Sequence, residues 1–300
     1  MKRLLSFLLI LILLLSGCAA PKRQNEKPLI LCTLFATYDW TRNILGDQVD
    51  QFDLRLLGNG ADLHSFEPSA LDFAFLQQAD LLICNGGSSE DWLPKEQEHL
   101  LNLAEHSSLL AFPHDHTEEE HEHTEDEHTW LSLGNAQKAT DAICDALCAL
   151  APDLGQELKE NAAAYKEQLS ALDKDYQAAC SNAKRRILIF ADRYPFRYLA
   201  ADYNLTCYAA FDGCSAETEA GAATVSMLAD AVNTHQAKAV FILEQSKPDL
   251  AQTVIESSNT QSIEILTLNA MQSMDQTALA QTTYLDVMKQ NLETIKKAIY

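Results

Sequence analysis

Residues 153–183 read DLGQELKENAAAYKEQLSALDKDYQAACSNA, and this stretch decides how the chain is organised. It has no internal proline, and its single glycine lies near its start. Its apolar residues recur at helical spacing, which predicts one amphipathic helix of about thirty residues: Leu158, Ala162, Tyr165, Leu169, Leu172 and Tyr176. At 1.5 Å per residue such a helix covers about 40 Å, more than one small domain needs. We therefore expect residues 153–184 to form a linking helix between two lobes.

Short apolar runs alternate with helical stretches on both sides of this helix. This alternation predicts an α/β fold of two Rossmann-like lobes, residues 29–152 and 185–300, each with a parallel sheet covered by helices. The runs that predict strands are LILCTLF (29–35), FDLRLL (52–57), DLLICNGG (80–87) and SLLAF (108–112) in the first lobe, and RRILIFA (185–191), LTCYAAF (205–211), AVFILEQ (239–245) and IEILTL (263–268) in the second.

The first 28 residues have the features of an export signal followed by a tether. Two positive charges precede an apolar run, Leu4 to Leu15, that is too short to span a bilayer comfortably. The string LSGC ending at Cys18 resembles the bacterial lipobox; the alternative is an ordinary signal with an incidental cysteine. We expect residues 1–17 to be a lipoprotein signal peptide and residues 18–28 a lipidated stalk. The mature protein is then extracytoplasmic and lipid-anchored to the bacterial cell membrane through Cys18.

The chain is strongly acidic, with a formal charge of −21. Removal of residues 1–17 takes away two positive charges and no acid, so the mature charge is −23. So acidic a protein is a poor nucleic-acid binder. It can attract cations, although the acidity can equally serve solubility alone.

Seven cysteines remain besides Cys18, an odd number that leaves at least one unpaired within the chain. Cys207 and Cys214 are close enough in sequence to pair across a turn. The apolar surroundings of Cys32, Cys84 and Cys144 indicate small core residues. No CxxC pair is present, which argues against a cysteine zinc knuckle.

Residues 114–130 read HDHTEEEHEHTEDEHTW, with five histidines and eight carboxylates. Imidazole and carboxylate groups are ligands for divalent cations, but so polar a stretch cannot fix its own shape. We expect four of its histidines to form an auxiliary metal-gathering loop: His114, His116, His121 and His123. The fifth, His128, differs because Trp130 and Leu131 can anchor the backbone beside it.

Three further candidates lie where predicted strands end, the edge at which ligands gather in parallel sheets. His64 follows the second predicted strand, and Asp192 and Glu244 come at the ends of two strands in the second lobe. Each also has a simpler interpretation. His64 can be a solvated loop residue, Asp192 part of a salt-bridged hinge, and Glu244 a helix cap.

The lipobox, GADLHSFEP (60–68), the acidic His-rich loop, DEHTWL (126–131) and the long central helix occur in that order. This series resembles the metal-receptor (solute-binding) lipoproteins of ABC transporters for zinc and manganese, over nearly all the mature chain. The resemblance implies two α/β lobes joined by a rigid helix, with one metal ion in the cleft between them. It also implies that His64 and His128 are ligands, and that residues 113–127 are the His-rich loop typical of zinc members.

The second lobe departs from that pattern. An H/E-x-x-F-x-Y-like segment of the family matches residues 193–198, and places Arg193 at the ligand position. A guanidinium has no lone pair for a cation. We therefore predict Asp192 as the ligand in its place, with Glu244 as a fourth ligand or as the partner of Arg193. Two imidazoles and one or two carboxylates suit tetrahedral Zn²⁺, with Mn²⁺ as the alternative.

The sequence thus predicts metal capture rather than catalysis. We expect a monomeric, extracytoplasmic, high-affinity zinc receptor that delivers the ion to an ABC-type import permease. The alternatives are a manganese-specific receptor of the same type and a surface zinc buffer or adhesin. A secreted zinc hydrolase is disfavoured because neither H-E-x-x-H nor G-x-S-x-G occurs in the chain.

Overall fold

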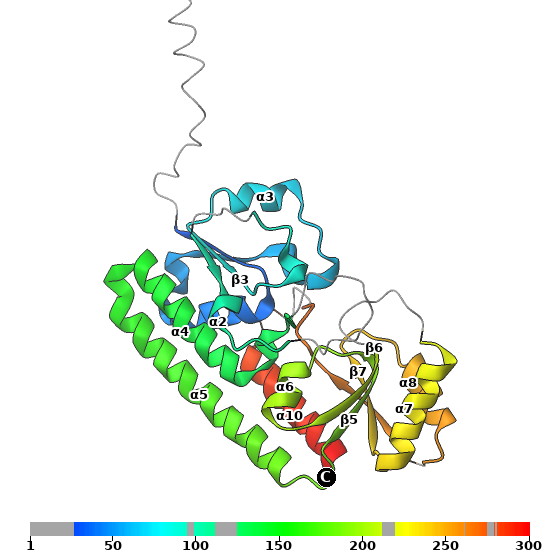
Figure 1. The fold of residues 1–300 in the computed structure, drawn as a ribbon. Helices are drawn as coiled ribbons and strands as arrows, with labels where there is room; N and C mark the ends of the chain where they lie inside the picture. Colours follow the sequence, from blue (N-terminus) through cyan, green and yellow to red (C-terminus); the bar gives the residue numbers. More distant parts are fainter. Residues whose placement is uncertain are drawn as a thin grey trace, which may run out of the picture.

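Two parallel four-stranded sheets, one in each lobe, form the framework of the protein (Figure 1). The structure is a computed structural model that describes residues 27–94, 99–111, 125–211, 220–260, 262–274, 279 and 281–300. The strand orders are β2-β1-β3-β4 and β6-β5-β7-β8, so both sheets are built in the same way. The predicted two-lobed α/β architecture is confirmed.

The first sheet consists of β1 (Leu29–Cys32), β2 (Asp53–Leu56), β3 (Leu81–Cys84) and β4 (Leu100–Asn102). Side chains of β1 alternate between its two faces, as the pleat requires. Ile30 and Cys32 face the main core, whereas Leu29 and Leu31 face a smaller apolar cluster that includes Leu76 of α3 (Ala70–Leu76). The sheet is therefore covered on both faces, with α2 (Phe35–Leu45) on the side of the main core.

The second sheet consists of β5 (Ile187–Arg193), β6 (Thr206–Phe211), β7 (Ala239–Leu243) and β8 (Glu264–Leu268). Helices α7 (Ala222–His235) and α8 (Asp249–Ser257) cover its outer face. The short α6 (Arg197–Asp202) follows β5, and α10 (Tyr284–Ile299) ends the chain and packs on α5, α2 and β5.

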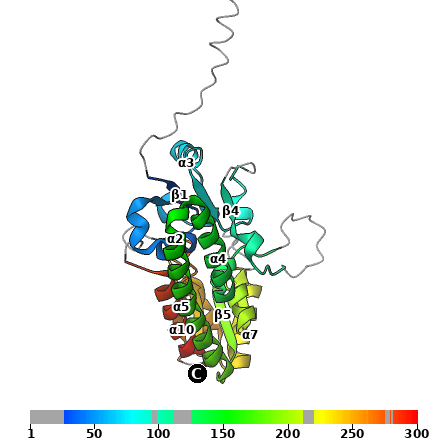
Figure 2. The same ribbon diagram turned by 90° about the vertical axis from the view of Figure 1, so that its left-hand side faces the viewer.

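Helix α5 (Gly155–Ser181) is the predicted linking helix. With α4 (Leu133–Leu150) it runs along the length of the molecule, as Figure 2 shows. All six residues of its predicted apolar stripe are buried. They belong to one continuous core that also contains Ile30 of the first sheet and Phe190 of the second. The linking helix thus joins the lobes by shared packing as well as by chain connection.

One predicted strand is wrong. SLLAF (108–112) forms no strand over its described residues, 108–111, apart from an isolated bridge between Ala111 and Glu125. Backbone N–H groups of this segment bond to side chains instead of to a neighbouring strand. Asn135 Oδ1 accepts from the N–H of Ser108, and the Tyr198 hydroxyl accepts from the N–H of Leu110. The fourth strand is instead Leu100–Asn102, which pairs with β3.

The expectation for Cys32, Cys84 and Cys144 is confirmed, because all three are buried in the core. Cys207 is a free thiol in the structure, and its proposed partner Cys214 lies outside the described residues. No helix in the described part of the chain combines the length and apolar character that crossing a bilayer requires.

Replacing Leu169 by alanine should show how far stability depends on the shared core. Leu169 on α5 is fully buried, so Leu169→Ala should lower the free energy of unfolding by about 2–5 kcal/mol. The neighbouring Gln168→Ala, on the exposed face of the same helix, is the matched control and should change it by less than about 0.5 kcal/mol. Equal effects of the two variants in urea unfolding would show that the α5 stripe does not carry the packing.

Candidate metal centre

His64 lies in a one-turn helix, Leu63–Ser65, beyond the carboxyl end of β2. The Asp62 carboxylate caps this turn by accepting a hydrogen bond from the backbone N–H of His64, at 3.0 Å. On the ring, Nδ1 lies 2.6 Å from the Ser89 hydroxyl and 3.2 Å from Oε1 of Glu127. These contacts hold the imidazole with 14% of its side chain exposed.

His128 is held by its own neighbours in sequence. Oδ1 of Asp126 accepts hydrogen bonds from the backbone N–H and from ring Nδ1 of His128, both at 2.8 Å. Trp130 and Leu131, the predicted anchors, are fully buried. The Trp130 indole also donates to the carbonyl of Ala270 in the second lobe, at 2.7 Å. The prediction that packing fixes the backbone beside His128 is therefore confirmed.

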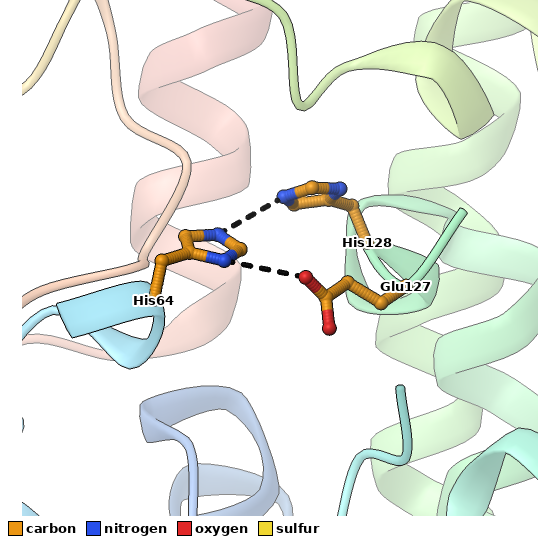
Figure 3. Close-up of side chains that lie close together, drawn as sticks. All are labelled: His64, Glu127 and His128. Carbon is orange, nitrogen blue, oxygen red and sulfur yellow. Dashed lines mark hydrogen bonds and ion pairs between the residues drawn. The ribbon is translucent and has the colours of Figure 1, made fainter. Parts of the chain in front are cut away.

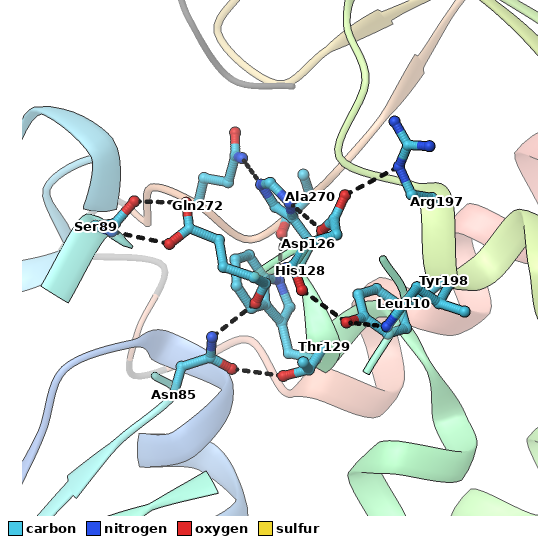
Figure 4. Close-up of polar contacts among 12 residues, drawn as sticks. Asn85, Ser89, Leu110, Asp126, His128, Thr129, Arg197, Tyr198, Ala270 and Gln272 are labelled. Atoms are coloured by element: carbon cyan, nitrogen blue, oxygen red, sulfur yellow. Dashed lines mark hydrogen bonds and ion pairs between the residues drawn. The ribbon is translucent and has the colours of Figure 1, made fainter. Parts of the chain in front are cut away.

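Two residues of the second lobe, Arg197 and Tyr198, bind Asp126 (Figure 4). The Tyr198 hydroxyl donates to the carbonyl oxygen of Asp126 at 2.6 Å, and Nε of Arg197 lies 3.3 Å from its Oδ2. From the first lobe, the Asn85 amide donates to the carbonyl of Glu127 and accepts from the Thr129 hydroxyl. The segment that carries His128 is thus held from both lobes.

The two imidazoles face each other through their Nε2 atoms, which lie 3.4 Å apart (Figure 3). Two imidazole nitrogens that bind one tetrahedral zinc ion at roughly 2.0–2.1 Å stand about 3.3–3.4 Å apart. The spacing of His64 and His128 therefore fits a zinc ion.

Carboxylates on the opposite edges of both rings favour the tautomer that a metal needs. Nδ1 of His128 faces Asp126, and Nδ1 of His64 faces Ser89 and Glu127. A proton on each Nδ1 satisfies these acceptors and leaves the lone pair on each Nε2. Ligating histidines in metalloproteins carry this kind of carboxylate partner.

Glu127 was not predicted as a site residue. With His64 and His128 it forms a group of potential ligands whose nearest atoms lie within 4.8 Å of one another, among the residues that the structure describes. Yet its Oε1 faces Nδ1 of His64, on the far edge of the ring from Nε2. We therefore interpret Glu127 as the residue that orients His64. The sequence feature that could have identified Glu127 is its position directly before His128.

Burial alone would raise the pKa of the Glu127 carboxyl, but hydrogen bonds from His64 and Ser89 outweigh it. The pKa falls to about 2, so the group is ionised at neutral pH. Both its oxygens are engaged, since the Ser89 hydroxyl donates to Oε1 at 2.7 Å and the Ser89 backbone N–H donates to Oε2 at 2.9 Å.

Gln272, a second residue that the sequence did not single out, lies at the point where the imidazoles converge. Its side-chain Nε2 is 2.9 Å from Nε2 of His64 and 3.0 Å from Nε2 of His128. It comes from the segment after β8 in the second lobe and is 3% exposed. Glutamine is common on surfaces, so its residue type gave no signal.

Asp192 and Glu244 lie at strand ends in the second lobe, as expected, but their carboxylates hold backbone. Asp192 accepts from the N–H of Arg193 and of Leu243, at 2.8 and 2.9 Å. Glu244 accepts from the N–H of Ala270 at 2.7 Å and of Gln272 at 3.2 Å. The assignment of Asp192 and Glu244 as ligands stays a prediction.

The Arg193 guanidinium of the second lobe is compensated by an acid of the first lobe. Its NH1 lies 3.7 Å from Oδ2 of Asp62, the residue that caps the His64 turn. Burial raises the pKa of Glu244 to about 7, and the positive charge of Arg193 partly opposes that rise. The remaining predicted site residues, His114, His116, His121, His123 and Cys18, lie outside the described residues.

A model of the family described as zinc-uptake complex component A, periplasmic, matches residues 30–298. The chain belongs to this zinc-uptake family. It is 32% identical to the zinc-binding lipoprotein AdcA of Streptococcus pneumoniae over 95% of the chain, but spans only 58% of the length of that relative. It is 28% identical to the high-affinity zinc uptake system protein ZnuA of Bacillus subtilis, over 92% of the chain and 89% of ZnuA.

Solved structures of the same kind share the fold. The crystal structure of the Zn(II)-bound ZnuA-like domain of S. pneumoniae AdcA matches 91% of the chain and 99% of that domain, with a TM-score of 0.73 and 28% identity. The metal-dependent lipoprotein YcdH of B. subtilis matches 91% of the chain and all of its own length, with a TM-score of 0.74 and 25% identity. Membership of the zinc-uptake family therefore agrees with the two-lobed architecture.

The low pKa of Glu127 predicts a specific loss of stability in acid. Because the folded-state pKa lies below its ordinary value, the ionised carboxylate stabilises the folded chain at neutral pH. This contribution is lost as pH falls from about 4.5 towards 2. Glu127→Gln should therefore lower the free energy of unfolding more at about pH 5 than at about pH 3, as measured by urea unfolding without metal.

The exposed neighbour Glu125 provides the control for that measurement. Glu125→Gln should leave the dependence of stability on pH as it is in the parent chain. A Glu127→Gln variant with the same pH dependence as the parent would contradict the assigned ionisation of Glu127.

Proposed function

We propose that this chain is an extracytoplasmic zinc receptor that delivers the ion to an ABC-type import permease. The observation that carries the proposal is the pair of imidazole Nε2 atoms, 3.4 Å apart, each with a carboxylate at its Nδ1. Membership of the zinc-uptake family and the zinc-bound state of the AdcA domain support zinc as the cargo. A transport receptor releases its ion unchanged, so no catalytic role is proposed.

His64 and His128 are the proposed ligands from the first lobe. The second lobe contributes Gln272 at contact distance from both rings, while Asp192 and Glu244 remain candidate ligands. Two imidazoles with oxygen ligands suit Zn²⁺. Mn²⁺ binds more weakly to such a set, which makes manganese the second choice of cargo.

The proposal also covers the lipid anchor at Cys18 and the His-rich loop. Lipid on Cys18 would hold the protein at the outer face of the membrane, next to its permease. His114, His116, His121 and His123 would raise the local zinc concentration beside the cleft. Similarity to the zinc-binding lipoprotein AdcA and membership of a periplasmic zinc-uptake family support this placement.

Zinc titration by calorimetry tests the proposed centre. The chain from residue 24 onward retains every described residue and should bind one zinc ion tightly. His64→Ala or His128→Ala should weaken this site by about a hundredfold or more, since each removes one of few ligands. His106→Ala, an exposed histidine outside the site, should bind zinc like the parent. A tight site that survives both ligand substitutions would contradict the proposal.

Replacing residues 114–124 by two glycines separates a receptor from a buffer. The replacement stops short of Glu125 because Glu125 pairs with Ala111, and Asp126 and Glu127 hold the histidines. The tight site should survive with an unchanged dissociation constant, while weaker additional sites are lost. Loss of all tight binding would mean that the His-rich loop is the working site and that the chain is a surface buffer.

A further inference from the structure

Gln272 reaches the candidate centre from the second lobe, with its side-chain nitrogen at hydrogen-bond distance from both imidazoles. The backbone N–H of Leu63 donates to the carbonyl of Gln272 at 3.1 Å, and the N–H of Met274 donates to the carbonyl of Gly60 at 2.7 Å. These two bonds join the segment after β8 to the loop that carries His64. Gln272 is therefore positioned by both lobes.

Contacts within the second lobe fix the same segment from behind. Both oxygens of Glu244 accept backbone N–H groups, from Ala270 at 2.7 Å and from Gln272 at 3.2 Å. The Trp130 indole binds the carbonyl of Ala270. Met271, between Ala270 and Gln272, has a φ of 58°. This is a left-handed conformation that a residue other than glycine adopts only when its surroundings require it. The backbone is thus held so that the Gln272 side chain enters the centre.

Only the nitrogen of the Gln272 amide matches what the imidazoles offer. With the protons on Nδ1 of both rings, both Nε2 atoms are acceptors. An amide NH₂ group has two N–H donors, and its nitrogen lies 2.9 and 3.0 Å from the two acceptors. The hydrogen-bond network therefore assigns the nitrogen, rather than the oxygen, to the position between the rings.

An ion at this centre needs the same two lone pairs. The amide nitrogen carries no basic lone pair, so it can occupy the position but cannot ligate the ion. The amide oxygen can ligate, because carbonyl oxygens of glutamine bind cations. A half-turn of the terminal amide exchanges the two atoms without moving the backbone.

We propose that Gln272 controls ion capture and release, with its amide NH₂ competing for both histidines and its amide oxygen serving as a neutral ligand once the amide has turned. This inference rests on the proposed zinc-receptor function. The neutral oxygen attracts the ion less than a carboxylate would, and the competing NH₂ group reoccupies both lone pairs when the ion leaves. Gln272 therefore favours rapid release.

The experiment measures the rate of zinc dissociation by stopped flow with a chelator, on the chain from residue 24 onward. Gln272→Glu keeps the length of the side chain, removes the donors and supplies a charged oxygen. It should slow dissociation by about tenfold or more, equivalent to about 1.4 kcal/mol. Gln272→Leu removes both donor and oxygen and should speed dissociation by about tenfold or more.

Two controls separate this inference from its premise. Gln281→Glu adds the same charge on an exposed turn and should leave the dissociation rate unchanged. His64→Ala should abolish the tight site. If His64→Ala binds zinc as the parent does, the zinc-receptor proposal itself fails. If binding needs His64 but Gln272→Glu and Gln272→Leu both release zinc at the parental rate, only the role of Gln272 is overturned.

The side-chain amide of Gln272 gives a direct readout in the parent chain. Its two N–H signals in a ¹⁵N-correlated NMR spectrum are identified by their absence in Gln272→Leu. Saturating zinc should shift both signals as their hydrogen bonds to the imidazoles are lost. Signals that keep their positions in the zinc-saturated protein would show that the amide does not turn, and would overturn the proposal.

Discussion

Two carboxylates, of Asp126 and Glu127, set the position of the proton on both imidazoles, and the candidate centre depends on this constraint. Asp126 contacts Nδ1 of His128, and Glu127, together with Ser89, contacts Nδ1 of His64. Each Nε2 can then present a lone pair to the same point. Neighbouring acidic residues thus organise two histidines that are 64 positions apart in the chain. Neither ring has to reorient to bind an ion.

The architecture keeps these contacts in register. One apolar core runs from the first sheet through α5 to the second sheet, so a large relative movement of the lobes would disrupt it. Polar contacts between the lobes, such as Tyr198 with Asp126 and Trp130 with Ala270, lie directly around the centre. Conformational adjustment during binding is therefore easiest in side chains and in short segments around the centre. Gln272 fits this constraint because its amide can turn while its backbone stays bound.

Sequence periodicity was sufficient for the lobes and for α5, because both depend on burial patterns that repeat along the chain. The roles of His64 and His128 came from the family resemblance rather than from periodicity; the structure brings their rings together, and their assignment as ligands stays a prediction. Periodicity failed at Leu100–Asn102, since a strand of three residues carries little pattern. Glu127 and Gln272 could not be assigned roles, because their positions depend on contacts between distant segments: Ser89 with Glu127, and Glu244 with the backbone of Gln272.

The isolated bridge between Ala111 and Glu125 has an evolutionary consequence. It places the chain beside Ala111 immediately before Asp126. Lengthening the connection between two fixed points is inexpensive, since each doubling of its length adds only about 0.6 kcal/mol of closure entropy. The histidine and acid content between these two residues can therefore expand, shrink or change composition over generations without altering the geometry of the two ring nitrogens. Under the proposed function, selection can then tune metal gathering by the loop separately from the affinity of the centre.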